Sequence, residues 1–219
     1  MEVVYEDNHI IIVNKSSGEI VQGDKTGDTP LSEHVKNYLK EKYNKPGNVF
    51  CGVVHRIDRP VSGLVIFART SKALERLNKM LRDGNIHKTY WALVEGTPEC
   101  PEKTLENFLV SDGRINKTFV SDSRNPDAKK SILSYKTVAT GDRYTLLEVN
   151  LLTGRKHQIR AQLSANGNPI KGDLKYGARR SNRDGSISLQ AHRIEFTHPV
   201  SGQQISLEIP PLPDMQKLL

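Results

Sequence analysis

The polar segment His55–Gly63 carries residue types that could do chemistry. It reads HRIDRPVSG and directly precedes an apolar run at 63–68. Its proline and glycine restrict the backbone, so we expect a structured loop at the entrance to a buried strand. Asp58 stands between Arg56 and Arg59, and close cations favour an ionised carboxylate, which can act as nucleophile or base. The same spacing also fits a surface cluster of ion pairs, and the local pattern does not decide between the two.

Two further segments have functional and structural interpretations. Leu151–Arg160 (LLTGRKHQIR) follows a strand pattern and opens a helix, whose N-terminus suits a phosphate or carboxylate. A basic helix start on a solvated face is the alternative. His87–Glu95 alternates as a strand, and Tyr90 on it could stack on an extruded base or could simply belong to the core.

The chain lacks the patterns of metal and nucleotide sites. Its seven histidines show no H-E-x-x-H spacing, and Cys51 and Cys100 form no C-x-x-C pair. No P-loop, G-x-S-x-G elbow or G-x-G-x-x-G turn is present. We therefore expect no metal and no cofactor, and two free thiols that fit a reducing, cytoplasmic compartment.

Composition points to a globular protein with a polyanionic partner. The 219 residues are 36% hydrophobic and 26% charged, with a net charge of +7. A basic protein attracts nucleic acid, although charge alone is weak support for that function. No apolar run is long enough to span a bilayer, and the acidic start is unlike a signal peptide.

The elements that must position these residues can be predicted from periodicity. The segment 99–130 is the least regular part, and 178–186 is expected to be an exposed basic loop. No repeat or linker appears, so we predict a single α+β domain over 1–219. The expected strands are 3–5, 10–13, 63–68, 87–95, 132–139, 143–151 and 203–209, and the expected helices begin at Pro30 (Leu31, Val35 and Leu39 inward), after an N-cap at Ser71 (Leu74, Leu77 and Leu81 inward) and at Lys156.

In this order, the segments resemble the RluA family of pseudouridine synthases. The family's His-Arg-Leu-Asp-x-x-Thr-Ser-Gly loop stands here as HRIDRPVSGLVIFART, and residues 87–96, 151–177 and 189–199 look like later family motifs. The opening VVYEDNHIIIVNKSSG is similar to the family's first strands. The resemblance spans nearly the whole chain, and it implies a mixed, largely antiparallel central sheet with flanking helices and loops.

The chain departs from the family pattern at a few positions. Ile57 replaces a leucine and Val61 a threonine, the proline typical after Lys15 is missing, and Gln162 and Gln190 stand where histidine is common. These changes bear on substrate detail more than on activity. No residues precede position 1 for the S4-type RNA-binding domain of many relatives, so we expect RNA selection to come from the catalytic domain or from a partner.

The resemblance implies that Asp58 is the catalytic carboxylate of an RNA uridine isomerase. It further implies that Arg160 pairs with Asp58, that Tyr90 stacks on the uracil and that Arg56 fills the gap left by the flipped nucleotide. Ile159 and Leu64 would be apolar walls. The expected phosphate contacts are Arg155, Lys156, Lys171, Lys175, Arg179 and Arg180.

The expected partner is transfer or ribosomal RNA, with no DNA and no membrane, and the protein is expected to be a monomer. One alternative is a non-catalytic RNA-binding module of the same fold, which would not need Asp58. A second is a basic hydrolase acting through Asp58 and His157, for which no oxyanion or metal signature exists.

Overall fold

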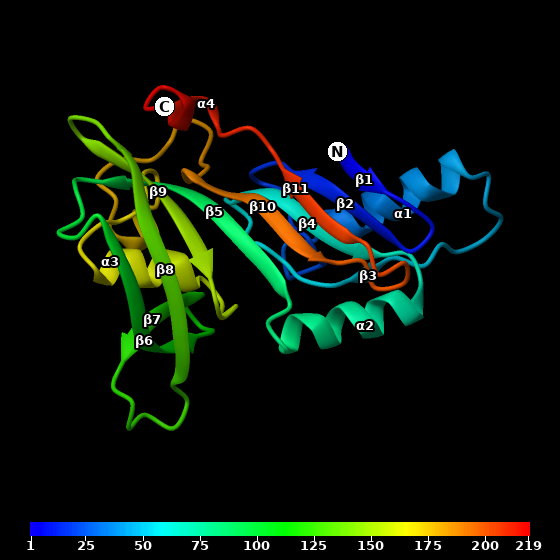
Figure 1. Ribbon diagram of the computed structural model, residues 1–219, viewed down its shortest axis with the longest axis horizontal. Coiled ribbons are helices and arrows are strands. Elements are labelled where there is room, and N and C mark those ends of the chain that lie inside the picture. Colours follow the sequence, from blue (N-terminus) through cyan, green and yellow to red (C-terminus); the bar gives the residue numbers. More distant parts are fainter. The chain divides into compact units, whose positions relative to one another are not determined.

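The computed structural model describes residues 1–219. The chain divides into two compact units: the first is Met1–Ile86 with Arg193–Ile209, and the second is His87–His192 with Pro210–Leu219. Each unit is described by itself below. The single domain expected over the whole chain stays a prediction. The elements are labelled in Figure 1.

The first unit is a sheet with two helices. Its strand order is β1-β2-β4-β10, with β3 paired to β4 and β11 to β10. β2 pairs antiparallel with β4, so that Ile12 lies opposite Ile66 and Lys15 opposite Gly63. The bounds are β1 Glu2–Glu6, β2 Ile10–Lys15, α1 Leu31–Lys42, β3 Gly52–Val53, β4 Ser62–Ala68, α2 Ser71–Arg82, β10 Leu189–Thr197 and β11 Gln204–Glu208.

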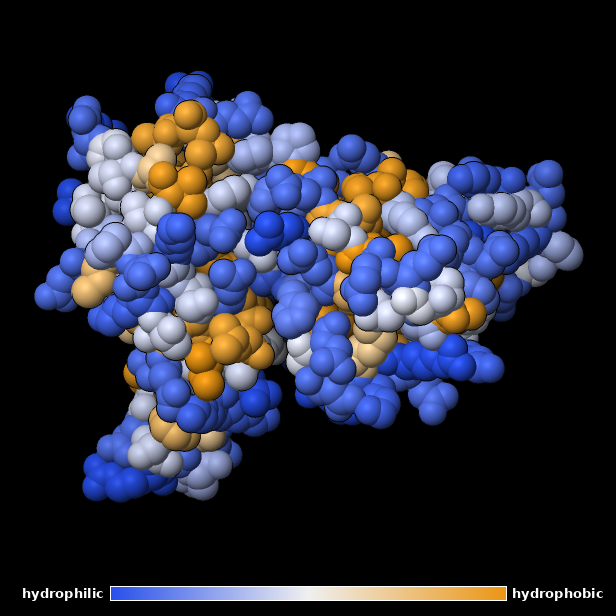
Figure 2. Space-filling model, viewed as in Figure 1, coloured by the Kyte–Doolittle hydropathy of each residue, from blue (hydrophilic) through white to orange (hydrophobic).

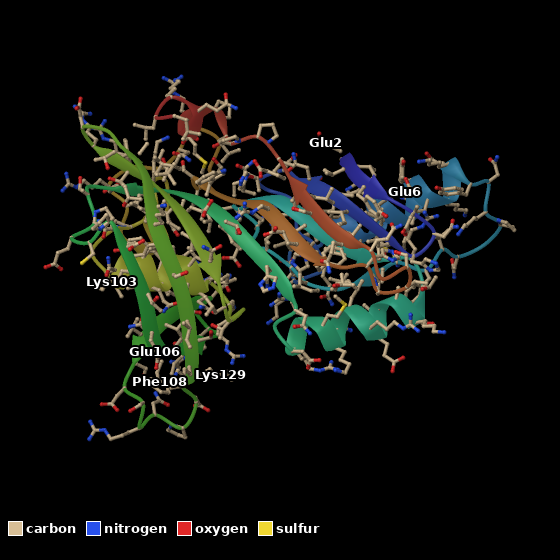
Figure 3. The ribbon with its side chains drawn as sticks, viewed as in Figure 1. Glu2, Glu6, Lys103, Glu106, Phe108 and Lys129 are labelled. Atoms are coloured by element: carbon tan, nitrogen blue, oxygen red, sulfur yellow. The ribbon has the colours of Figure 1, made fainter.

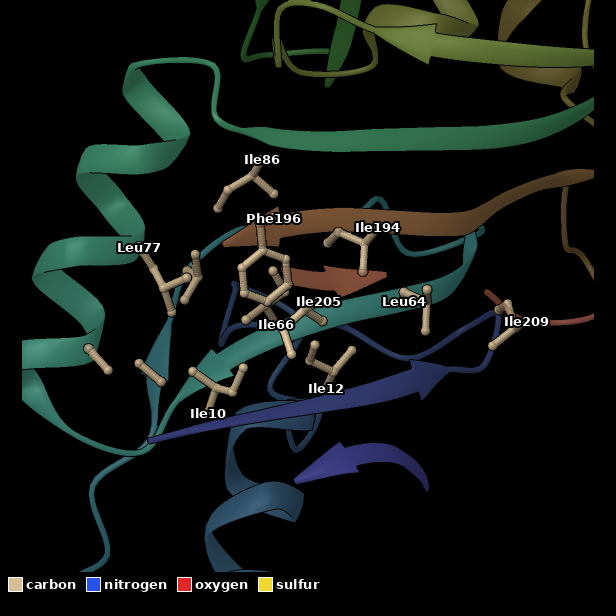
Figure 4. Packing of buried hydrophobic residues seen from close by; sticks show 13 residues of the cluster. Ile10, Ile12, Leu64, Ile66, Leu77, Ile86, Ile194, Phe196, Ile205 and Ile209 are labelled. Atoms are coloured by element: carbon tan, nitrogen blue, oxygen red, sulfur yellow. The ribbon is translucent and has the colours of Figure 1, made fainter. Parts of the chain in front are cut away.

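An aliphatic core fills one face of this sheet under α2 (Figure 4). Successive side chains of β2 and β4 point to opposite faces of the sheet, and nearly all of them are buried, so both faces of these strands are covered. Leu77 of α2 is fully buried against this core, and Leu74 and Leu81 pack on it partly buried, as their helical spacing predicted. The labelled core residues are Ile10, Ile12, Leu64, Ile66, Leu77, Ile86, Ile194, Phe196, Ile205 and Ile209.

The N-cap of α2 differs from the predicted one. The cap is Thr70, whose extended backbone (φ −138°, ψ 151°) lets its Oγ1 accept the N–H of Ala73 at 3.2 Å. Ser71 is the first helical residue instead. Both residues are good N-caps, so sequence alone could not separate them. α1 begins at Leu31 after Pro30 and buries Leu31, Val35 and Leu39, as predicted.

The second unit is an antiparallel sheet in the order β5-β9-β8-β6-β7. α3 packs against β6 and β7 on one side of it, where Ala161 meets Leu109 and Tyr176. The bounds are β5 Ile86–Glu95, β6 Glu102–Asp112, β7 Lys117–Ser121, β8 Lys129–Thr140, β9 Tyr144–Leu151, α3 Gln158–Ala165, the 3₁₀ turn η1 Leu174–Tyr176 and α4 Pro213–Gln216.

The prediction that 99–130 is irregular was wrong. β6, β7 and the start of β8 form a long antiparallel meander there, along which Glu106, Phe108 and Lys129 are labelled in Figure 3. Leu105 and Leu109 are buried on one face of β6, but polar Asn107 lies between them and apolar Phe108 and Val110 lie on the other face. The sequence of β6 therefore shows no period-two alternation. β10 was missed for a related reason, since polar Gln190 and His192 are buried along it. The predicted α+β class with a largely antiparallel sheet is confirmed.

Candidate active site

The Asp58 loop lies in the first unit between β3 and β4, and backbone contacts fix its shape. The N–H of Val61 donates to the Asp58 carbonyl at 3.0 Å, and the N–H of Gly18 donates to the Arg59 carbonyl at 2.8 Å. The Ser17 hydroxyl donates to the carbonyl of Pro60 at 3.1 Å. The half-buried Asp58 therefore lies on a loop that hydrogen bonds from Ser17 and Gly18, in the turn after β2, hold in place.

A buried lysine supports the same loop, and sequence reasoning missed it. Lys15 is fully buried at the end of β2, and its ammonium donates to the carbonyls of Ser16 at 2.9 Å, Glu19 at 2.8 Å and Arg59 at 3.1 Å. Burial lowers the pKa of Lys15 to about 8, while the negative charges of Glu19 and Asp58 oppose that shift. The available signal was its position two residues after the apolar run at 10–13.

The two arginines beside Asp58 have different surroundings. Arg59 binds the carboxylate of Asp28 at 2.6 Å, with both side chains about half exposed. This pair ties the Asp58 loop to the polar segment before α1. Arg56 is exposed on the same loop. Besides the neighbouring arginines, Lys15 is a source of positive charge that acts on Asp58.

In the second unit, Arg160 is held by a buried bidentate ion pair. Its Nε and Nη2 donate to Oδ2 and Oδ1 of Asp173 at 2.7 and 2.9 Å, with side chains 6% and 2% exposed. The guanidinium also lies 4.9 Å from the centre of the Tyr176 ring. A bidentate pair fixes the plane of the guanidinium as well as its position. Sequence reasoning missed Asp173; the pairing of Arg160 with Asp58 stays a prediction.

The start of α3 is fixed by a buried network around Tyr176. The Tyr176 hydroxyl accepts the N–H of Thr118 at 2.8 Å and shares a hydrogen bond of 2.8 Å with Nδ1 of His157. His157 is the N-cap of α3 and adopts the left-handed conformation at φ 51°. Burial raises the pKa of Tyr176, so its hydroxyl stays protonated. We began this helix at Lys156; the structure begins it at Gln158.

Two glutamines anchor α3 to the strands. Gln158 Oε1 accepts the Thr153 hydroxyl at 2.9 Å and the Arg155 N–H at 3.0 Å, and its amide donates to Gln162 at 3.0 Å. Gln162 in turn donates to the Leu105 carbonyl at 3.1 Å and to other acceptors of β6 and β8. At position 162, where histidine is common in the family, the buried amide of Gln162 thus has hydrogen bonds at both its oxygen and its nitrogen.

Tyr90 lies on β5 in the second unit, opposite Val149 of β9, and is 6% exposed. Lys88 points to the same side of β5, because side chains two apart on a strand share a face. Burial lowers the pKa of Lys88, and its Nζ lies 3.6 Å from the position that a Cβ on Gly154 would take. Sequence reasoning did not single out Lys88.

The two apolar wall candidates are both buried. Ile159 on α3 is 5% exposed, and Leu64 is 1% exposed within the aliphatic core of the first unit. Packing accounts for the burial of Leu64. The roles of both residues toward a substrate stay predictions.

The candidate phosphate ligands occupy different settings in the second unit. Arg155 and Lys156 are exposed after Gly154, before α3 begins. Lys175 donates to the Asn116 carbonyl at 3.2 Å, and the Arg179 backbone N–H donates to Glu95 at 2.9 Å. The structure brings Lys171 and Arg180 together in the lining of one cavity.

No group of three or more His, Cys, Asp or Glu side chains is arranged to hold a metal ion. None of the helices combines the length and the hydropathy needed to cross a bilayer.

Comparisons with known proteins agree on one family. A model described as RNA pseudouridylate synthase matches residues 9–165. Ribosomal large subunit pseudouridine synthase D of Zymomonas mobilis is 31% identical, over 100% of this chain and 71% of that protein. tRNA pseudouridine synthase C of Pectobacterium carotovorum is 29% identical, over 95% of this chain and 58% of that protein. The solved human RNA pseudouridylate synthase domain containing 4 has a like fold, with a TM-score of 0.82 at 19% identity over 98% of this chain and 90% of that one.

Proposed function

We propose, from the premise that this chain belongs to the RNA pseudouridylate synthase family, that it isomerises uridines of ribosomal or transfer RNA through the carboxylate of Asp58. The enzyme is an RNA pseudouridine synthase. The C1′–N1 bond of uridine breaks, the uracil turns, and C5 bonds to C1′. N1 gains a proton and C5 loses one, so the product is an isomer of the substrate.

The observation that carries the proposal is the support of the Asp58 loop. The ammonium of Lys15 and the N–H of Gly18 both bind the Arg59 carbonyl, one residue after Asp58. A carboxylate on a preorganised loop needs little rearrangement before it attacks the sugar or removes its 2′ proton. A module that only binds RNA would gain nothing from a carboxylate held on a supported loop, because the carboxylate repels the phosphates of the RNA.

The other roles follow from the types of the remaining side chains. Because the target edge of uridine is hidden in stacked RNA, the base must be extruded. Tyr90 stacks on the uracil and takes part in proton transfer at C5. Arg56 is exposed, and its planar guanidinium can replace the flipped base in the stack. Arg160, already held by Asp173, positions Asp58.

The net charge of +7 and the names of two relatives, a ribosomal large subunit and a tRNA pseudouridine synthase, support these classes of RNA as the substrate. Arg155 and Lys156 are exposed and suited to phosphates. Cys51 and Cys100 are both free, which agrees with a reducing compartment such as the cytoplasm. We propose a monomer as the active form, to be checked by light scattering.

Tritium release from C5-labelled bulk RNA tests the catalytic assignment. Asp58→Asn should abolish release and leave the urea midpoint unchanged, whereas the matched control Asp83→Asn, at the end of α2, should keep full activity. Near-normal turnover by Asp58→Asn would sink the assignment, and RNA binding without release by the natural chain would favour the non-catalytic alternative. Pseudouridine mapping in total RNA with and without the gene then identifies the target.

A further inference from the structure

A cavity of about 510 Å³ lies in the second unit, bounded by the basic loop 178–186 and by the start of α4. The loop passes beside α4 in Figure 1. The cavity has the size of a small-molecule site. Its lining includes Lys171, Arg180, Arg183 and Asp214.

The charges of this cavity are not balanced within the protein. Lys171 Nζ binds Asp214 at 2.6 Å, and the Ser188 hydroxyl donates to the same carboxylate oxygen at 2.6 Å. Asp184 is used by its own loop, where it accepts the Ser186 N–H at 3.1 Å and hydroxyl at 2.6 Å. Arg180 and Arg183 are exposed and make no ion pair with a carboxylate. Asp184 keeps its negative charge, so the three cationic and two anionic side chains of the lining leave a net charge of +1 to attract an anion.

The loop that carries these arginines is held in place. The Asn182 amide donates to the hydroxyls of Ser186 at 3.2 Å and Ser188 at 3.3 Å. Gly172 adopts φ +90°, and a Cβ there would stand 2.7 Å from the Ser186 carbonyl oxygen. The loop thus packs directly on the backbone next to Asp173, the partner of Arg160. The two arginines are thus carried by a loop whose backbone has defined contacts with the chain at Gly172.

The cavity also has an apolar wall. Tyr144, Leu212 and Pro213 line it, and hydrophobic residues gather at the surface around α4 in Figure 2. An aromatic and apolar wall beside guanidiniums suits a nucleotide, whose base can lie on the wall while its phosphate meets the arginines. An inorganic anion would contact the cationic side chains of the lining but not the apolar ones.

We infer that this cavity binds an unpaired nucleotide of the RNA substrate, separate from the uridine that is isomerised, with its phosphate on Arg180 and Arg183. The inference rests on the proposed function, because it concerns the same RNA. It assigns the cavity a role in RNA affinity and selection rather than in chemistry.

The test compares Arg180→Gln/Arg183→Gln with the natural chain on C5-tritiated bulk RNA. We expect KM to rise roughly tenfold with kcat nearly unchanged. The slope of log affinity against log salt should fall by about 1, because a single phosphate contact is lost. The control Lys136→Gln/Arg143→Gln removes two exposed charges of the second unit that do not line the cavity. It should leave KM within about twofold, because it removes the same amount of charge without removing a contact to the nucleotide.

Three results would overturn the inference. They are an equal KM for both double variants, a loss of kcat rather than of affinity, and an unchanged RNA affinity in the cavity variant while inorganic phosphate binds only to the natural chain. The last would assign the cavity to a free phosphate. If the natural chain releases no tritium, the proposed function fails instead. RNA affinity measured by filter binding still tests the cavity in that case.

Discussion

Arg160 and Asp173 form a buried, bidentate ion pair in which Nε and Nη2 of the arginine meet Oδ2 and Oδ1 of the aspartate at 2.7 and 2.9 Å. Asp173 lies one residue after Gly172, against which the basic loop packs. The residue expected to position the catalytic carboxylate is thus itself positioned by the segment that lines the cavity.

Asp173→Asn should strongly destabilise the protein. Removing one charge of a buried pair leaves the other uncompensated, which costs about 3 to 5 kcal/mol of unfolding free energy. The exposed pair Lys130–Glu106 provides the control, since Glu106→Gln should cost at most about 1 kcal/mol. Urea unfolding measures both variants. Equal, small losses would show that Arg160 does not depend on Asp173.

Lys15→Met should change both stability and the pH profile. The pKa of Lys15 is lowered to about 8 from 10.5, so the folded protein releases this proton more readily than the unfolded chain. The contribution of Lys15 to unfolding free energy therefore becomes more favourable as pH rises from about 8 to 10.5. The unfolding free energy of the natural chain minus that of Lys15→Met, both measured with urea, should therefore increase across this pH range.

The activity of the natural chain should change with pH in the opposite direction to the stability contribution of Lys15. As pH rises through about 8, Lys15 loses a proton that binds one of three loop carbonyls. We expect kcat to fall on this limb in the natural chain and to be low and flat in Lys15→Met. A variant with the natural kcat and the natural alkaline limb would remove Lys15 from the support of Asp58.

Tyr176→Phe should lower activity by more than its effect on stability explains. The change removes the hydroxyl that links Thr118 to His157 at the start of α3, and an unsatisfied buried group costs about 1 to 3 kcal/mol. The control is Tyr135→Phe, which loses a bond of 3.2 Å to the Cys100 carbonyl. Both should unfold earlier in urea, but only Tyr176→Phe should reduce tritium release among folded molecules.

Gly172→Ala should be worse than Gly177→Ala, although both glycines have positive φ, +90° and +97°. A Cβ on Gly177 meets nothing within 4 Å, so only backbone strain of about 1 kcal/mol is expected there. A Cβ on Gly172 would stand 2.7 Å from Ser186 O. Thermal melting should separate the two variants, and equal melting temperatures would argue against a rigid loop.

Periodicity predicted the first unit better than the second. The runs Ile10–Val13 and Gly63–Ala68 and the stripe of Leu31, Val35 and Leu39 are all buried as predicted. The two strand runs are buried on both faces, which leaves a continuous apolar stretch in the sequence. The long meander of β6 and β7 was not predicted, because most of its side chains on both faces are exposed or half-buried. Strand pairing there comes from neighbouring backbone, which leaves little trace in hydropathy.

By itself, the sequence determined the family and the reaction, because ordered motifs such as HRID retain the residue types that the family shares. The catalytic role of Asp58 stays a prediction. Only the tertiary structure decided which groups support them. Lys15 binds a carbonyl 44 residues away, and Arg160 binds a carboxylate 13 residues away. Such partners are chosen by folding, since hydrogen bonds and ion pairs act over a few ångströms of space and not along the chain.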